Sequence, residues 1–270
     1  PTIFGDSPYQ PSSGCAGNIY FIDLDKLVDE GLLEKEEILG YNWGTDESEI
    51  DYAALHQNRC KILQKAFERF DTNAQEFQDF VKKQSEWLEQ YALFMTLKTD
   101  NLYKNWSEWP SEYRNTQTVA LEKYQKKNYN TITFWKFCQY KFFEQWEDLK
   151  NYANSKGIYI IGDISFYVGY DSVDVWAERQ LFMMSANDTP EYVAAAGPDK
   201  YSESGQVWGN PMYEWNAMKE DNFSWWRKRM RVCRELFDIV RIDHFAGIVK
   251  AYAVPYGQDK SPVSYTHLTL

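Results

Sequence analysis

Two separate stretches of the sequence repeat one pattern, in which a helical segment leads into a short apolar strand followed by an aspartate. The first strand covers residues 158–161 and is followed by Asp163, and the second covers residues 239–242 and is followed by Asp243. Alternating helices and strands predict a parallel sheet with helical crossovers. The uninterrupted apolar run at residues 158–161 is typical of a strand buried on both faces. We therefore expect an α/β fold in which both acids lie at the carboxyl edge of one sheet.

The second strand brings an arginine next to its terminal acid. Because side chains alternate along a strand, Arg241 and Asp243 point to the same side. A neighbouring guanidinium favours the ionised carboxylate, so Arg241 would hold Asp243 charged and oriented. Chemistry in parallel α/β proteins collects at the carboxyl ends of strands. A structural salt bridge at the strand end explains the pair equally well.

Apolar residues at three-and-four spacing predict helices over much of the rest of the chain. The predicted helical segments are residues 23–33, most of 50–103, 133–153 and 212–237. Residues 170–210 are rich in Gly, Pro, Ser and Asn, which indicates a long functional loop. Residues 261–270 show neither helical nor strand patterning, and we interpret them as a candidate unrelated tail.

The composition excludes several classes of protein. A net charge of -11 argues against nucleic acid or an anionic membrane surface as a partner. No window approaches the roughly 18 consecutive apolar residues of a membrane span. The four cysteines are far apart without a C-x-x-C pair, and the three histidines are scattered. This pattern favours reduced thiols in a cytoplasmic protein over a disulfide framework or a metal site.

Paired strand-end aspartates suggest glycoside cleavage, which needs one carboxylate as nucleophile and a second carboxyl group as acid. The aromatic content of 17% agrees with sugar binding, although most of these rings must fill the core. A phosphate or dinucleotide site is disfavoured because no G-x-G-x-x-G and no G-x-x-x-x-G-K-[ST] occurs. A G-x-S-x-G nucleophile elbow is missing too. A non-catalytic domain that binds carbohydrate or a partner remains an alternative.

Four separated segments of the sequence resemble those of a known family. They are residues 5–10 (Gly-Asp-Ser-Pro-Tyr-Gln) with 16–18, residues 162–163 with 170–172 and 174–176, residues 205–211 (Gly-Gln-Val-Trp-Gly-Asn-Pro), and residues 240–245 (Val-Arg-Ile-Asp-His-Phe) with Gly247. In this order and at this spacing they are similar to the 4-α-glucanotransferases of the amylomaltase and disproportionating-enzyme family, glycoside hydrolase family 77 of the α-amylase clan. The first and third segments are specific to this family, whereas Arg-x-Asp at a strand end is shared by the clan.

The resemblance implies an α/β fold, a partial TIM (β/α)8 barrel with helical insertions that is truncated before the end of the barrel. Residues 1–270 would form the partial catalytic domain, and residues 50–153 a helix-rich segment that includes an inserted subdomain. The implied reaction is transfer of α-1,4-glucan segments between maltooligosaccharides by a retaining double displacement. No metal or organic cofactor is implied, and the oligomeric state is left open.

The resemblance also implies roles for individual residues. Asp243 matches the nucleophile that forms the covalent glycosyl-enzyme, and Arg241 positions it. Asp163 and His244 match residues that contact sugar hydroxyls where the donor glucose binds.

Four further residues match loops around the same cleft. Ser7 and Tyr9 correspond to a loop that touches the donor region. Gln206 and Trp208 correspond to a mobile loop over the acceptor side, where Trp208 would stack on glucose and help to exclude water.

The chain departs from the family pattern in two respects. Ser165 stands where the family commonly has proline after the strand-three acid. The family's general acid, a glutamate at the end of strand five, would lie beyond residue 270. We therefore expect these 270 residues to be inactive and poorly folded alone. An α-amylase-clan hydrolase of α-glucans or a non-catalytic carbohydrate-binding fragment is the alternative function.

Overall fold

The computed structural model describes residues 7–258 except residues 47, 117, 199 and 201. The predicted tail at residues 261–270 therefore lies outside the described residues. The α-helices are α1 (Leu24–Asp29), α2 (Lys35–Leu39), α3 (Tyr52–Arg69), α4 (Gln75–Lys83), α5 (Ser85–Asp100), α6 (Ser111–Arg114), α7 (Val119–Lys127), α8 (Tyr129–Ser155), α9 (Val173–Ala177), α10 (Trp215–Glu220) and α11 (Ser224–Leu236). The strands are β1 (Ile161–Ile164), β2 (Tyr192–Ala196), β3 (Gln206–Pro211), β4 (Ile239–Ile242) and β5 (Ala253–Pro255).

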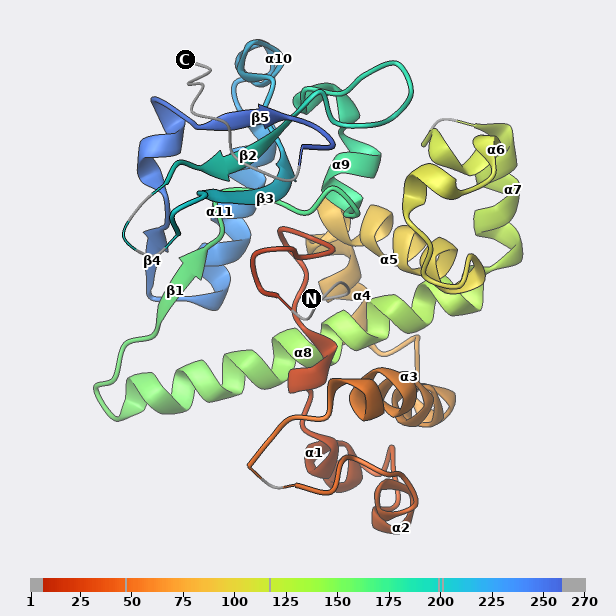
Figure 1. The fold of residues 1–270 in the computed structure, drawn as a ribbon. Coiled ribbons are helices and arrows are strands. Elements are labelled where there is room, and N and C mark those ends of the chain that lie inside the picture. The colour runs from red at the N-terminus through yellow and green to blue at the C-terminus, as the bar shows by residue number, and fades with distance from the viewer. Residues whose placement is uncertain (1–6, 47, 117, 199, 201, 259–270) are drawn as a thin grey trace.

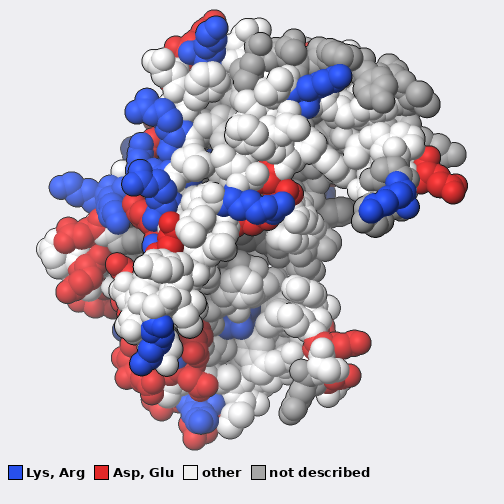
Figure 2. Space-filling model, turned by 90° about the vertical axis from the view of Figure 1, so that its left-hand side faces the viewer, with Lys and Arg blue, Asp and Glu red and all other residues white. Residues whose placement is uncertain are grey.

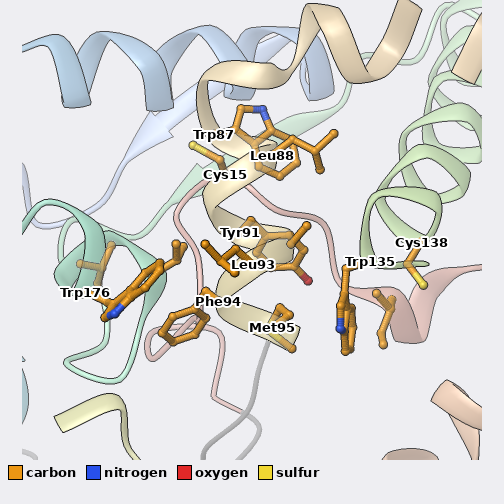
Figure 3. Close-up of a cluster of buried hydrophobic side chains, with 14 of the residues drawn as sticks. Cys15, Trp87, Leu88, Tyr91, Leu93, Phe94, Met95, Trp135, Cys138 and Trp176 are labelled. Carbon is orange, nitrogen blue, oxygen red and sulfur yellow. The ribbon is translucent and has the colours of Figure 1, made fainter. Parts of the chain in front are cut away.

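Helix α5 lies at the centre of the helical half of the molecule. Its side chains are apolar on nearly every face, which is the pattern of a helix surrounded by other elements. Figure 3 shows Trp135 and Cys138 of α8, Trp176 of α9 and Cys15 of the amino-terminal loop arranged around it, and all four are buried. The high aromatic content is thus explained largely by this core.

The carboxyl end of α5 carries a buried lysine. The Lys98 ammonium donates hydrogen bonds to the carbonyl oxygens of Tyr103 and Lys104, at 3.0 and 2.7 Å, and to Asp171 Oδ2 at 2.5 Å. A buried charge is tolerated only when it is paired and hydrogen-bonded, as it is here. Lys98 thereby ties the loop after α5 to the segment that precedes α9.

The predicted parallel sheet is present as the pair β1–β4. Asp163 lies opposite Arg241 in the register, so both side chains project from the same face. The other face carries Gly162 and the buried Ile164, and α11 packs behind it (Figure 1). Gly162 is required because a Cβ there would lie 2.0 Å from the ring of Phe237. This close approach fixes the spacing between the sheet and the segment that follows α11.

The first strand differs from its prediction in position and burial. It begins at Ile161, includes Asp163, and leaves the side chains of Ile158, Tyr159 and Ile161 more than half exposed. The preceding residues form a connection held by Asp238, whose carboxylate accepts the Ile160 N–H at 2.8 Å. Among the described residues, β1 pairs only with β4, so the expected burial of both faces is wrong for this sheet.

Two other segments also differ from the sequence prediction. Residues 212–237 form two helices, because Asn222 and Phe223 adopt left-handed backbone angles. Asp221 accepts a hydrogen bond from the N–H of Ser224, the first residue of α11. Residues 170–210 contain α9 and two strands in place of a continuous loop. Strand β2 pairs antiparallel with both β3 and β5, so this sheet has the order β3-β2-β5.

Acidic and basic side chains are interspersed on the face shown in Figure 2, and uncharged residues occupy much of it. Among the described residues, no helix is both long and apolar enough to cross a membrane.

Candidate active site

A cavity of about 480 Å³ opens where the β1 and β4 strand ends meet the amino-terminal loop and β3. Figure 1 shows that loop next to β3 although the two are far apart in sequence. The cavity is lined by Ser7, Tyr9, Gln10, Ser165, Phe166, Tyr167, Gln206, Trp208, Asn210, Asp243 and His244. Six of the eight residues singled out from the sequence are in this set.

The other two residues, Asp163 and Arg241, are connected by ion pairs to Asp243, which lines the cavity. One terminal N–H group of Arg241 donates a hydrogen bond to Asp163 Oδ2 and the other donates to Asp243 Oδ1, so one guanidinium bridges the two carboxylates. These side chains are 57%, 42% and 36% exposed for Arg241, Asp163 and Asp243, so the pairs add little to stability. Their geometric effect is to point Asp243 at the cavity with one oxygen engaged.

His244 follows Asp243 in an unusual backbone conformation. Its φ of 50° lies in the left-handed region, which is costly for a residue with a Cβ and is found often at functional sites. This turn places the imidazole edge-on to Trp208, with 5.4 Å between ring centroids. The Nε2 atom is buried and has no hydrogen-bond partner among the described residues. It is therefore available to a polar group entering the cavity.

Aromatic rings form one wall of the cavity. Tyr167 lies 6.0 Å from His244 and 6.3 Å from Trp208 between ring centroids. Burial raises the pKa of the Tyr167 phenol, and its hydroxyl also lacks a partner within the described part of the chain. Trp208 Nε1 donates to Gln206 Oε1 at 3.1 Å, and the following Gly209 has a φ of 79° in an irregular part of β3. The wall thus presents flat apolar faces beside unpaired polar atoms.

The loop after β1 is fixed from behind by α11. Buried Arg229 donates to the Ser165 carbonyl oxygen at 2.7 Å, and its guanidinium stacks over Trp225 and Trp226. The Tyr213 hydroxyl donates to the carbonyl oxygen of Phe166. Ser165, the departure from the family pattern, lines the cavity and leaves this loop firmly held.

Sequence reasoning gave no role to Gln10, Ser165, Phe166, Tyr167 or Asn210. Gln10 and Asn210 lie inside the two family-specific segments, which was a usable signal. Phe166 and Tyr167 could not be separated from the many core aromatics by sequence alone.

The polar side chains that line the cavity carry hydroxyl, carboxylate, amide and imidazole groups. Within the described ranges, no group of three or more His, Cys, Asp or Glu side chains is arranged to hold a metal ion.

Two parallel strands whose acidic ends open into an aromatic cavity match the arrangement of active sites in (β/α)-barrel enzymes, which lie at the carboxyl ends of the strands. The chain belongs to the 4-alpha-glucanotransferase family, glycoside hydrolase family 77, whose family model matches residues 1–268. The resemblance seen in the sequence is thereby confirmed.

Individual relatives agree with this assignment. The 4-alpha-glucanotransferase of Streptococcus pneumoniae is 43% identical over 263 residues, which are 96% of this chain and 52% of the relative. That of Clostridium butyricum is 40% identical over 259 residues, covering 95% of this chain and 53% of the relative. The chain thus spans about half the length of the curated relatives it matches.

Solved structures confirm the fold class. The amylomaltase from Streptococcus agalactiae in complex with acarbose matches with a TM-score of 0.91 and 36% identity, covering 97% of this chain and 53% of that chain. Amylomaltase from Corynebacterium glutamicum, at 20% identity and a TM-score of 0.69, shares the fold. The described residues therefore form part of a TIM barrel with helical insertions.

Proposed function

We propose that the full-length protein carrying this chain is a 4-α-glucanotransferase that moves α-1,4-glucan segments between maltooligosaccharides. The observation that supports this most strongly is that residues far apart in the sequence line the same cavity. Ser7, Tyr9, Gln206, Trp208, Asp243 and His244 come from three distant segments and line one cavity. Family membership supplies the reaction, and the cavity supplies a site of suitable size and chemistry.

Asp243 is the nucleophile in this proposal. Its carboxylate attacks the anomeric carbon of the donor sugar, forming an ester bond as the glycosidic bond breaks. The leaving oxygen takes a proton from a general acid supplied by residues outside this chain. The 4-hydroxyl of an acceptor sugar then attacks the anomeric carbon of the ester and releases the Asp243 carboxylate. Its proton goes to the former general acid, which now acts as the base. Arg241 orients the Asp243 side chain through its hydrogen bond to Oδ1.

Four side chains hold the donor sugar. Asp163 and the unpartnered His244 Nε2 bind sugar hydroxyls beside the nucleophile, and the Ser7–Tyr9 loop closes the same region. The exposed Tyr9 ring offers a stacking face and a hydroxyl. Hydrogen-bonding groups and aromatic faces are what a sugar ring requires.

Gln206 and Trp208 act on the acceptor side. Transfer requires a sugar hydroxyl to intercept the glycosyl-enzyme before water does. Trp208 stacks on the acceptor and covers the ester, while the bond from its Nε1 to Gln206 fixes the indole.

The remaining expectations stay proposals. We place the protein in the cytoplasm, in agreement with the free thiols of Cys15, Cys60, Cys138 and Cys233. We propose α-glucans as its partners and neither nucleic acid nor membranes. The 270 residues alone are predicted to be inactive, because general acid catalysis contributes about 10²–10⁴-fold.

Product analysis with maltotriose tests the proposed function. The full-length protein should produce glucose and a ladder of longer glucans, and Asp243→Asn should abolish both. A hydrolase would give mainly glucose and maltose, and a binding module would leave maltotriose unchanged while still binding acarbose. Either of these results would overturn the proposal.

A further inference from the structure

We infer that Gln10 and Asn210 are positioning residues whose paired amides set the separation between the Tyr9 and Trp208 sides of the cavity. The inference deepens the proposed function and rests on it. Neither residue needs to touch the reacting atoms.

The two amides form a chain of hydrogen bonds across three segments. Gln10 Nε2 donates to the Trp208 carbonyl oxygen at 2.7 Å and to Asn210 Oδ1 at 3.0 Å. Asn210 Nδ2 donates to the carbonyl oxygens of Tyr9 at 3.2 Å and Val168 at 2.9 Å. The amino-terminal loop, the loop after β1 and strand β3 are therefore joined through four hydrogen bonds.

Packing leaves these amides little freedom to rearrange. Asn210 is 3% exposed, so an amide hydrogen bond lost there is not replaced easily by water. A Cβ on Gly169 would lie 3.2 Å from Gln10 Oε1 and from the Pro11 carbonyl oxygen, so the backbone approaches closely. Both amides are thus held in one arrangement.

This arrangement has a specific consequence for transfer. Tyr9 and Trp208 are held through their own backbone carbonyl oxygens, so the amide pair fixes the two aromatic residues relative to each other. Asp243 is held independently by Arg241. Loosening the pair should therefore weaken sugar binding between the two sides more than it slows the chemistry at Asp243.

Gln10→Leu removes both donated bonds at nearly constant size, and Gln10→Glu replaces the donors with oxygens that face two acceptors. Gln78→Leu is the matched control, because Gln78 donates its amide to the Thr72 carbonyl oxygen at 2.6 Å on the exposed surface of α4. The variants are made in the full-length protein and assayed for maltotriose disproportionation and for acarbose binding.

We expect Gln10→Leu to raise the KM for maltotriose and the Kd for acarbose about tenfold, which is the loss of one to two net hydrogen bonds. Its kcat should stay within about threefold, since the transition-state contacts at Asp243 remain. Water should gain access, so the hydrolysed fraction of product should rise. Gln10→Glu should be at least as impaired, and Gln78→Leu should match the wild type.

A purely structural role would give a different result. Gln10→Leu would then lower kcat in proportion to the folded fraction, with an unchanged KM, and this outcome would overturn the inference. Equal KM values for Gln10→Leu and Gln78→Leu in an enzyme that transfers glucan would also overturn it and leave the proposed function intact. A wild-type protein that makes no glucan ladder would overturn both.

Discussion

Replacing Gly162 with alanine should strain the sheet that carries the two acids. The new Cβ would lie 2.0 Å from Phe237 Cδ2, where ordinary contact begins at 3.4 Å. The ring must therefore retreat by more than 1 Å, which disturbs its edge-to-face contact with Trp146, 5.7 Å away between centroids. Overpacking of this kind costs about 1–3 kcal/mol, and we expect a value near the top of that range.

A double-mutant cycle isolates this contact. Phe237→Ala alone should cost about 2 kcal/mol, below the usual range for a buried phenylalanine because this ring is partly exposed. In the Phe237→Ala background, Gly162→Ala should cost almost nothing, which gives a coupling of about 2–3 kcal/mol. Gly197→Ala is the control, because among the described residues its Cβ would meet only Tyr252, at 3.8 Å.

Urea unfolding of the full-length protein, followed by circular dichroism, measures these differences. Gly162→Ala should also weaken acarbose binding, because displacing β1 moves Asp163 away from Arg241. If Gly162→Ala is as stable as Gly197→Ala, or if the two changes are additive, the close packing of β1 against Phe237 is not a determinant of the site.

Three further predictions concern charge and burial. The Arg69 hydrogen bond lowers the pKa of Glu37 from 4.5 to about 2, so the ionised carboxylate stabilises the fold above pH 4.5 and this contribution fades as the pH falls towards 2. Glu37→Gln should therefore be less stable than the wild type at pH 7 but not below pH 2. Equal urea midpoints for the two proteins at pH 7 would refute this. Burial raises the pKa of the Cys138 thiol, so a disulfide reagent should modify it only at the rate of unfolding, whereas rapid reaction in the native state would contradict its placement. Lys98→Met should cost about 3–5 kcal/mol in urea unfolding because it strips Asp171 of its cation, and a loss below about 1 kcal/mol would show that the pair is dispensable.

The sequence predicted the parts of the site that depend on local pattern. Strand β4 spans the predicted residues 239–242, and its parallel pairing with β1 brings Asp163 opposite Arg241. The register itself was not predicted: aligning the two terminal acids would place Asp163 opposite Asp243, whereas the structure places it opposite Arg241.

Other features depend on contacts that periodicity does not encode. The apolar run at residues 158–161 predicted a strand that begins at residue 158. The Ile160 N–H instead donates to the Asp238 carboxylate, and β1 begins at Ile161. The break before α11 comes from left-handed backbone angles at Asn222 and Phe223. No Gly or Pro at these two positions indicated a helix end in the sequence. Strand β2 has three consecutive alanines and no alternation of polar and apolar residues, so the sequence did not predict it as a strand. It is defined by its pairing with β3 and β5.

The most direct test of the proposed mechanism is to identify the residue that carries the covalent sugar. The full-length protein would be treated with 5-fluoro-α-D-glucosyl fluoride, whose glycosyl-enzyme turns over slowly, then quenched in acid, digested and mapped by mass spectrometry. We predict that the fluoroglucosyl group is attached to the peptide containing Asp243, and that Asp243→Asn carries none. Attachment at another carboxylate, or inverted products from maltotriose with no covalent adduct, would contradict the assignment of Asp243 as the nucleophile.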